Sequence, residues 1–203
     1  MNGEALTSIS AQARLQRIAA LVPEGSRVLD LGCGGGELLG LLREERRCTG
    51  YGVELDDSKV LECVQRGVNV IQRNLEEGLS LFDDGSFDVV LQLDTLQNLR
   101  NTEAMLRETA RVGRLGIVTF PNFAYWPHRL SVLRGRMPVS KSLPYQWYDT
   151  PNIRVATFKD FGVLARKNGL KVLTSFGLNE GQEIRHLPNW RASTAVFQFE
   201  RNS

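Results

Sequence analysis

A glycine-rich loop and a glutamate further along the chain are the residues whose types and spacing suggest chemistry. Asp30 precedes the glycines Gly32 and Gly34, and Glu54 follows about 20 residues later, the separation typical of nucleotide-binding βαβ units. Glycine permits a tight turn and a close approach of the backbone to a ligand. A carboxylate at the end of the next strand can accept hydrogen bonds from both hydroxyls of a ribose. We therefore predict a site for an adenosine-containing ligand.

The third position of the glycine pattern distinguishes two kinds of adenosine ligand. It is occupied by Glu37, whose carboxylate would oppose a pyrophosphate at the helix N-terminus. S-adenosylmethionine has no phosphate and carries a sulfonium and an ammonium, so we predict it, or S-adenosylhomocysteine, as the cofactor. Asp30 can offset the ammonium charge, and Asn74 can hydrogen-bond the adenine edge. The predicted cofactor-binding residues are Asp30, Gly32, Cys33, Gly34, Glu54 and Asn74.

Asp94 is the candidate catalytic base, and only its position after a predicted strand supports this assignment. It follows a predicted strand, where a side chain can reach a substrate that accepts a group from the cofactor. A carboxylate at that place can equally cap the turn that follows. Both interpretations stay open at this point.

An aromatic and basic stretch at about residues 121–154 is predicted to form a lid over the ligand end of the sheet. Such residues can line an acceptor pocket, anchor a protein interface or pack as an ordinary core. A stacking platform for single-stranded nucleic acid would need a charged groove, which a formal net charge of +2 does not indicate. The candidate lid residues are Tyr125, Trp126, Arg136, Tyr145, Trp147 and Tyr148.

The elements that would position these residues alternate along the chain. Short apolar runs at 27–31, 49–54, 68–71, 87–93 and 115–120 are separated by helical patterns, and two further runs at about 170–176 and 194–200 follow the lid. Asp56 and Thr157 are good N-caps for two of the helices. The pattern predicts a seven-stranded, mostly parallel sheet with helices on both faces and an antiparallel edge strand.

Length and composition predict one cytoplasmic domain over residues 1–203. With 203 residues, 42% of them hydrophobic, the chain can bury one sizeable core, and its charge balance predicts neither a nucleic-acid nor a membrane partner. No continuous run of eighteen apolar residues occurs.

Cys33, Cys48 and Cys63 lack a CxxC pattern, which argues against disulfides and zinc, and we expect Cys33 to pack rather than react. His128 and His186 lack metal spacing and are expected in surface or loop positions, so no metal site is predicted.

The segment 28–36, together with Glu54 and the strand opening at 87–90, resembles the class I S-adenosylmethionine-dependent methyltransferases. The resemblance implies a doubly wound, Rossmann-like fold. Many members place aspartate where this chain has Asn74. The segment 120–123 lacks the second proline of the Asn-Pro-Pro-Tyr pattern found in methyltransferases of adenine and glutamine amino groups, which disfavours that acceptor class.

A narrower resemblance covers nearly the whole chain. The segments 23–34, 49–54, 117–123, 135–139 and 143–153 are similar to the MetW family of bacterial methionine-biosynthesis proteins. That resemblance implies homoserine O-acyltransferase as the partner, with this chain as its accessory or regulatory subunit. The alternative is a methyltransferase that uses S-adenosylmethionine to methylate a small molecule.

Overall fold

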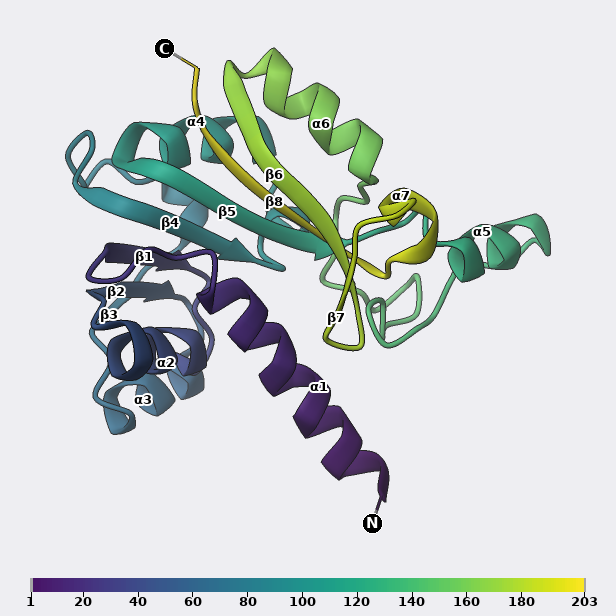
Figure 1. Cartoon of the computed structure of the whole chain (residues 1–203), viewed down its shortest axis with the longest axis horizontal. Coiled ribbons are helices and arrows are strands. Elements are labelled where there is room, and N and C mark those ends of the chain that lie inside the picture. Colours follow the sequence, from purple (N-terminus) through teal and green to yellow (C-terminus); the bar gives the residue numbers. More distant parts are fainter. Residues whose placement is uncertain (1, 203) are drawn as a thin grey trace.

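The computed structural model describes residues 2–202, with side chains from residue 9 to residue 202, and contains one eight-stranded sheet (Figure 1). The strands are β1 (Arg27–Leu31), β2 (Thr49–Glu54), β3 (Val70–Gln72), β4 (Phe87–Leu93), β5 (Gly113–Pro121), β6 (Leu170–Asn179), β7 (Gln182–Ile184) and β8 (Thr194–Arg201). Their spatial order is β3-β2-β1-β4-β5-β8-β6-β7. Strands β1 to β5 pair in parallel, and β8 pairs antiparallel with both β5 and β6.

The mostly parallel sheet with an antiparallel edge confirms the predicted fold class, but the predicted count of seven strands is wrong. The additional strand is β7, a three-residue strand that forms a hairpin with β6 and pairs antiparallel with it at the edge of the sheet. Its apolar pattern is too short to detect in the sequence. The last strand, β8, lies inside the sheet between β5 and β6.

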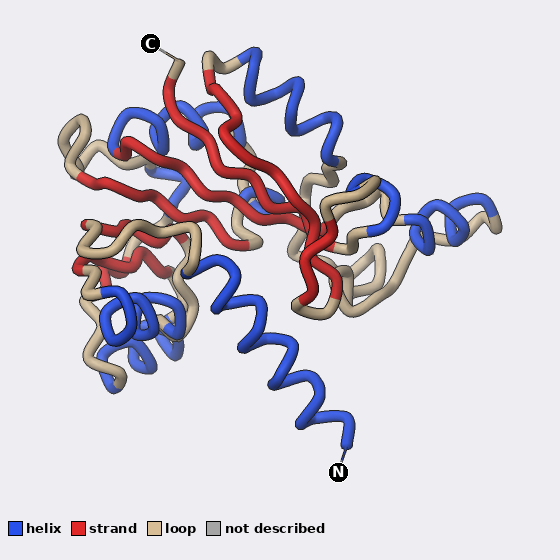
Figure 2. Tube along the Cα trace, viewed as in Figure 1, coloured by secondary structure: helices blue, strands red, loops and turns tan. Residues whose placement is uncertain are grey.

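Helices cover both faces of the sheet (Figures 1 and 2). They are α1 (Asn2–Ala19), α2 (Glu37–Arg46), α3 (Asp57–Gln65), α4 (Thr102–Val112), α5 (Trp126–Leu133), α6 (Phe158–Lys167) and α7 (Pro188–Arg191), with short 3₁₀ turns η1 (Leu75–Glu77) and η2 (Leu96–Asn98). One core, which includes Ile18, Leu38 and Cys63, lies on the face covered by α1, α2 and α3. The core on the opposite face, under α4 and α6, includes Phe161 and Phe197, whose ring centroids are 4.6 Å apart.

The two predicted N-cap residues, Asp56 and Thr157, begin helices as expected. Asp56 accepts hydrogen bonds from the backbone N–H groups of Ser58 and Lys59 at the start of α3. The hydroxyl of Thr157 accepts one from Asp160 at the start of α6. In addition, none of the described helices has both the length and the apolar character that a membrane crossing requires.

The segment predicted to form a lid, residues 121–154, contains one helix that the sequence did not reveal. Helix α5 lies between β5 and α6, and its His128 is only 1% exposed. The imidazole Nδ1 is 3.0 Å from the carbonyl oxygen of Asn122, and Nε2 is 2.8 Å from the hydroxyl of Ser140. The expected surface placement of His128 is therefore wrong, because this side chain is buried and joins the start of the segment, at Asn122, to its middle, at Ser140. Burial also lowers its pKa.

Candidate functional site

The glycine loop after β1 is seated tightly against its neighbours. Gly32 and Gly34 have φ values of 76° and 55°, which glycine adopts without strain. The N–H of Gly32 donates to the carbonyl oxygen of Val53 on β2 at 2.8 Å. A Cβ atom on Gly32 would lie 2.7 Å from the hydroxyl oxygen of Thr95, which follows β4. The loop is thus held by β2 on one side and by the turn after β4 on the other.

Glu54 faces this loop from the end of β2. Its Oε2 accepts a hydrogen bond from the N–H of Gly34 at 2.9 Å. Its Oε1 accepts from the N–H groups of Leu55 at 2.7 Å and Asp56 at 3.0 Å. Three backbone donors therefore fix the orientation of the carboxylate. Since each carboxylate oxygen has two lone pairs, Oε2 keeps one acceptor position for a ligand hydroxyl.

Asp30 is a buried carboxyl group with one oxygen that accepts no hydrogen bond. The residue is 3% exposed, and Oδ1 has no hydrogen-bond partner among the described residues. Burial first, and then the charges of Glu54 and Glu37, raise the pKa of Asp30 to about 7. A buried carboxyl beside two other acidic groups is a place where a cationic ligand group would be stabilised.

These residues fit S-adenosylmethionine or S-adenosylhomocysteine. A Cβ atom on Gly34 would meet nothing within 4 Å, so the loop borders open space next to Asp30 and Glu54. Asp30 provides a negative charge for an ammonium group, and Glu54 provides an acceptor for a ribose hydroxyl. The glycine loop itself has no positive side chain for a pyrophosphate. Arg66, which donates to the carbonyl oxygen of Gly35, is already paired with Glu37 at 3.1 Å.

The other two predicted cofactor-binding residues, Cys33 and Asn74, lie at the edge of the candidate site. The Cys33 side chain belongs to the core under α1, α2 and α3, and its thiol is 3.8 Å from that of Cys63. Burial, followed by the charge of Asp30, raises the pKa of the Cys33 thiol well above its usual range. Asn74 follows β3, and its Oδ1 accepts from the N–H of Glu76 at 3.0 Å. Its amide nitrogen makes no bond to a described residue and remains free to donate to an adenine.

Asp94 is tied into an ion pair that sequence reasoning missed. Its Oδ2 lies 2.6 Å from Nη2 of Arg14 on α1, and the hydroxyl of Thr119 donates to its Oδ1 at 3.1 Å. Arg14 also donates to Thr119 at 3.0 Å. Asp94 adopts a positive φ of 53°, as required by the sharp turn after β4. No sequence signal marks this pairing, because 80 positions separate the two partners.

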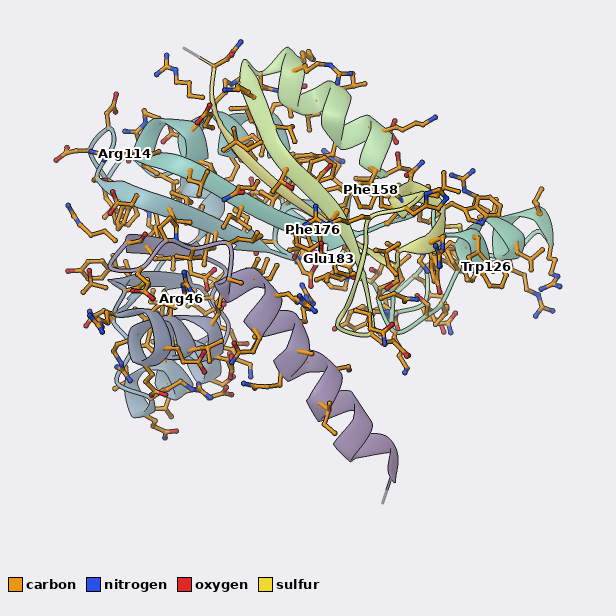
Figure 3. All side chains as sticks on the ribbon, in the orientation of Figure 1. Arg46, Arg114, Trp126, Phe158, Phe176 and Glu183 are labelled. Carbon is orange, nitrogen blue, oxygen red and sulfur yellow. The ribbon has the colours of Figure 1, made fainter. Side chains whose placement is uncertain are left out.

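Five of the six candidate lid residues are exposed to solvent. Trp147 and Tyr148 are each 71% exposed, and their rings meet edge to face. Figure 3 shows Trp126 at the far end of the molecule, away from Phe176 on the sheet. Tyr125 is half-buried against His128, while Arg136 and Tyr145 are exposed. The lid therefore presents its aromatic groups as a surface, and no described residues form a cluster suited to a metal ion.

The order of the strands in the sheet, the glycine loop after β1 and the glutamate at the end of β2 together define the fold of the S-adenosylmethionine-dependent methyltransferases. The solved magnesium protoporphyrin IX methyltransferase of Synechocystis PCC 6803, with bound SAH, superimposes with a TM-score of 0.69 at 18% identity, covering 99% of this chain and 88% of that one. Within this class, residues 12–199 match the model of the family "Methionine biosynthesis protein MetW". This chain belongs to the MetW family.

Two curated relatives refine the comparison. The bifunctional methionine biosynthesis protein MetXA/MetW of Rhodopirellula baltica is 37% identical over 93% of this chain, and the matched region is 32% of that protein. This chain thus spans about a third of that relative. A ubiquinone biosynthesis O-methyltransferase of Pseudomonas fluorescens Pf-5 is 29% identical over 80% of this chain and 72% of its own length.

Proposed function

We propose that this chain binds S-adenosylmethionine or S-adenosylhomocysteine and acts with homoserine O-acyltransferase as its accessory or regulatory subunit. The observation that carries the proposal is the Rhodopirellula baltica relative, which combines MetXA and MetW in one bifunctional protein. Parts that are fused in one organism often associate as separate chains in another. The exposed aromatic groups of the lid support the proposal, because aromatic and arginine residues are enriched at protein interfaces.

Each residue of the cofactor site has a distinct part in this proposal. Asp30 holds the ammonium group of the ligand, Gly34 admits its amino-acid tail, and Glu54 accepts a ribose hydroxyl. When bound, S-adenosylmethionine supplies a methyl group activated by its sulfonium. Asp94 is a poorly placed base for using it, because its carboxylate already contacts Arg14 and Thr119. Ligand binding would instead bias association with the partner, provided that the ligand binds the free and associated chain with different affinities.

Titration of Glu54→Ala with S-adenosylhomocysteine tests the cofactor site. Loss of a hydrogen bond to a charged acceptor should weaken binding by about 1 to 3 kcal/mol. Isothermal titration calorimetry measures this change. Glu44→Ala is a matched control, because Glu44 is an exposed glutamate on α2 outside the site. Equal affinity of Glu54→Ala and the unchanged chain would exclude Glu54 from the site.

Substitution of the lid aromatics tests the partnership. We expect Trp147→Ala to weaken association with homoserine O-acyltransferase at least about tenfold, because exposed aromatic anchors often contribute most to an interface. Arg136→Ala tests the basic part of the same surface. Tyr51→Ala is the control, since Tyr51 is an exposed aromatic on β2. The readouts are the dissociation constant and the acyltransferase rate with and without this chain. If the two proteins neither associate nor alter the acyltransferase rate, the proposal fails.

The alternative function is methyl transfer to a small-molecule acceptor. Its support is the similarity to the Pseudomonas fluorescens O-methyltransferase. In this case Asp94 would serve as the base after release from Arg14. Formation of S-adenosylhomocysteine by the isolated chain with an acceptor, together with a slower rate for Asp94→Asn, would favour this alternative.

A further inference from the structure

A cavity of about 520 Å³ lies between α4 and α6, on the sheet face opposite α2 and α3. Phe120 at the end of β5 and Phe161 on α6 form part of its apolar wall, together with Leu164. Gln97 and Arg154 line it where the turn after β4 meets the end of the lid. The glycine loop is absent from its lining, so this cavity is separate from the cofactor site.

Three arginines surround this cavity without forming an ion pair to any described residue: Arg100, Arg107 and Arg154. The Arg154 guanidinium is held in place, since its Nη2 donates to the carbonyl oxygen of Arg100 at 2.9 Å. Like charges gathered at one opening repel each other, and an anion between them would remove that repulsion. Guanidinium groups also match the planar geometry of a carboxylate.

The two acidic residues in the lining are already engaged. Glu103 forms an ion pair with Lys167 at 2.9 Å. Asp160 accepts a hydrogen bond from the hydroxyl of Thr157 at 2.7 Å. Lys167 first, and then the charge of Arg107, lower the pKa of Glu103, and the hydroxyl donor leaves the charge of Asp160 in place. Three arginines against two carboxylates leave the lining of the cavity with a net charge of +1.

The wall also contains a buried acceptor that lacks a donor. Gln97 is 8% exposed, and its Nε2 donates to the carbonyl oxygen of Asp94 at 2.7 Å. Its Oε1 has no partner among the described residues. A buried carbonyl oxygen without a hydrogen bond is destabilising. Because Oε1 is enclosed by the protein, the Gln97 side chain would have to rotate toward the cavity to accept a hydrogen bond from an N–H or O–H group of an occupant.

We propose that the cavity between α4 and α6 binds a small organic carboxylate that has an apolar or aromatic body and an N–H or O–H donor. The carboxylate would contact the arginines, the apolar body would lie on Phe120 and Phe161, and the donor would reach Gln97. This proposal rests on neither cofactor binding nor the acyltransferase partnership.

Binding of N-acetylphenylalanine to the full chain tests the proposal, because this probe has all three features. The neutral probe N-acetylphenylalaninamide keeps the ring and the amide and lacks the carboxylate. We expect the acid to bind at least about tenfold more tightly than the amide, since hydrogen bonds to charged groups have that strength. Amide NMR shifts should change in α4, α6 and around Gln97. Phenylpropionate, which lacks the N–H donor, should bind more weakly than N-acetylphenylalanine.

Two variants make the test specific to the cavity. Arg107→Gln should reduce the affinity for N-acetylphenylalanine at least about fivefold, because a charged hydrogen bond is lost. Arg166→Gln on α6 is the matched control, since Arg166 is exposed and does not line the cavity.

Equal binding of the acid and the neutral amide, equal effects of the two variants, or shift changes confined to the glycine loop would overturn the proposal. Failure of the acid to bind would also overturn it, and phenylpropionate binding equally well would exclude the Gln97 contact. All measurements omit S-adenosylhomocysteine and the acyltransferase, so their outcome is independent of the proposed function.

Discussion

Asp30→Asn is expected to stabilise the ligand-free chain at pH 8 and to abolish most of its affinity for S-adenosylhomocysteine. The pKa of Asp30 rises from 3.8 to about 7 on folding, so the folded chain holds this proton more tightly than the unfolded chain. The resulting stability penalty is absent below about pH 4, grows between about pH 4 and pH 7, and is complete above that window. Removing the ionisable group should therefore raise the free energy of unfolding at pH 8 by a few kcal/mol, and leave it unchanged at pH 4.

The same Asp30→Asn substitution that stabilises the ligand-free chain should lower its affinity for S-adenosylhomocysteine. Loss of the charge that pairs with the ammonium group should weaken binding by about 3 kcal/mol, or roughly 100-fold. In the unchanged chain, the affinity for S-adenosylhomocysteine should rise about tenfold from pH 6 to pH 8, as Asp30 loses its proton. The Asp30→Asn variant should show no such rise. Calorimetry at several pH values and urea unfolding measure the two effects. A pH-independent affinity of the unchanged chain would show that Asp30 does not contact the ligand charge.

Gly50→Ala should severely destabilise the fold. Gly50 on β2 pairs with Val28 on β1, and a Cβ atom at this position would collide with the carbonyl oxygen of Val28. Strand β1 cannot move aside, because Val28 also pairs with Val89 on β4. We expect a loss of more than about 4 kcal/mol, since this is a collision with backbone at the centre of the sheet.

The matched control for this prediction is Gly25→Ala. Gly25 also has a positive φ, of 70°, but a Cβ atom there would meet nothing within 4 Å. Its substitution should cost only about 1 to 2 kcal/mol of backbone strain. Thermal unfolding followed by circular dichroism should place the Tm of Gly50→Ala at least about 10 °C lower than that of the unchanged chain. Similar Tm values for the two variants would contradict the packing of β1 against β2.

The parallel half of the sheet was predictable because its signals are local. A central parallel strand is buried on both faces, and the nearly continuous apolar run of β1 reflects that burial. Asp56 and Thr157 mark helix starts through bonds to residues two or three positions away. Helices α5 and α7 have proline in the first turn but no side-chain cap, and strand β7 is only three residues long. The α5 region is held by contacts of Asn122 with the segment around α7 and of His128 with Ser140. Such contacts depend on the arrangement of distant segments and leave little trace in local sequence.

The sequence by itself determined the fold class and the MetW-family resemblance, and it predicts the residues of a candidate cofactor site, because a glycine loop and a strand-end glutamate have a characteristic spacing. Only the tertiary structure decided the protonation and the contacts of the individual side chains. Burial and neighbouring carboxylates set the pKa of Asp30, and a contact across 80 positions joins Asp94 to Arg14. The cavity between α4 and α6 likewise exists only where three segments meet. The physical reason is that desolvation, charge and cavity shape depend on distances in space, whereas sequence patterns record only neighbours along the chain.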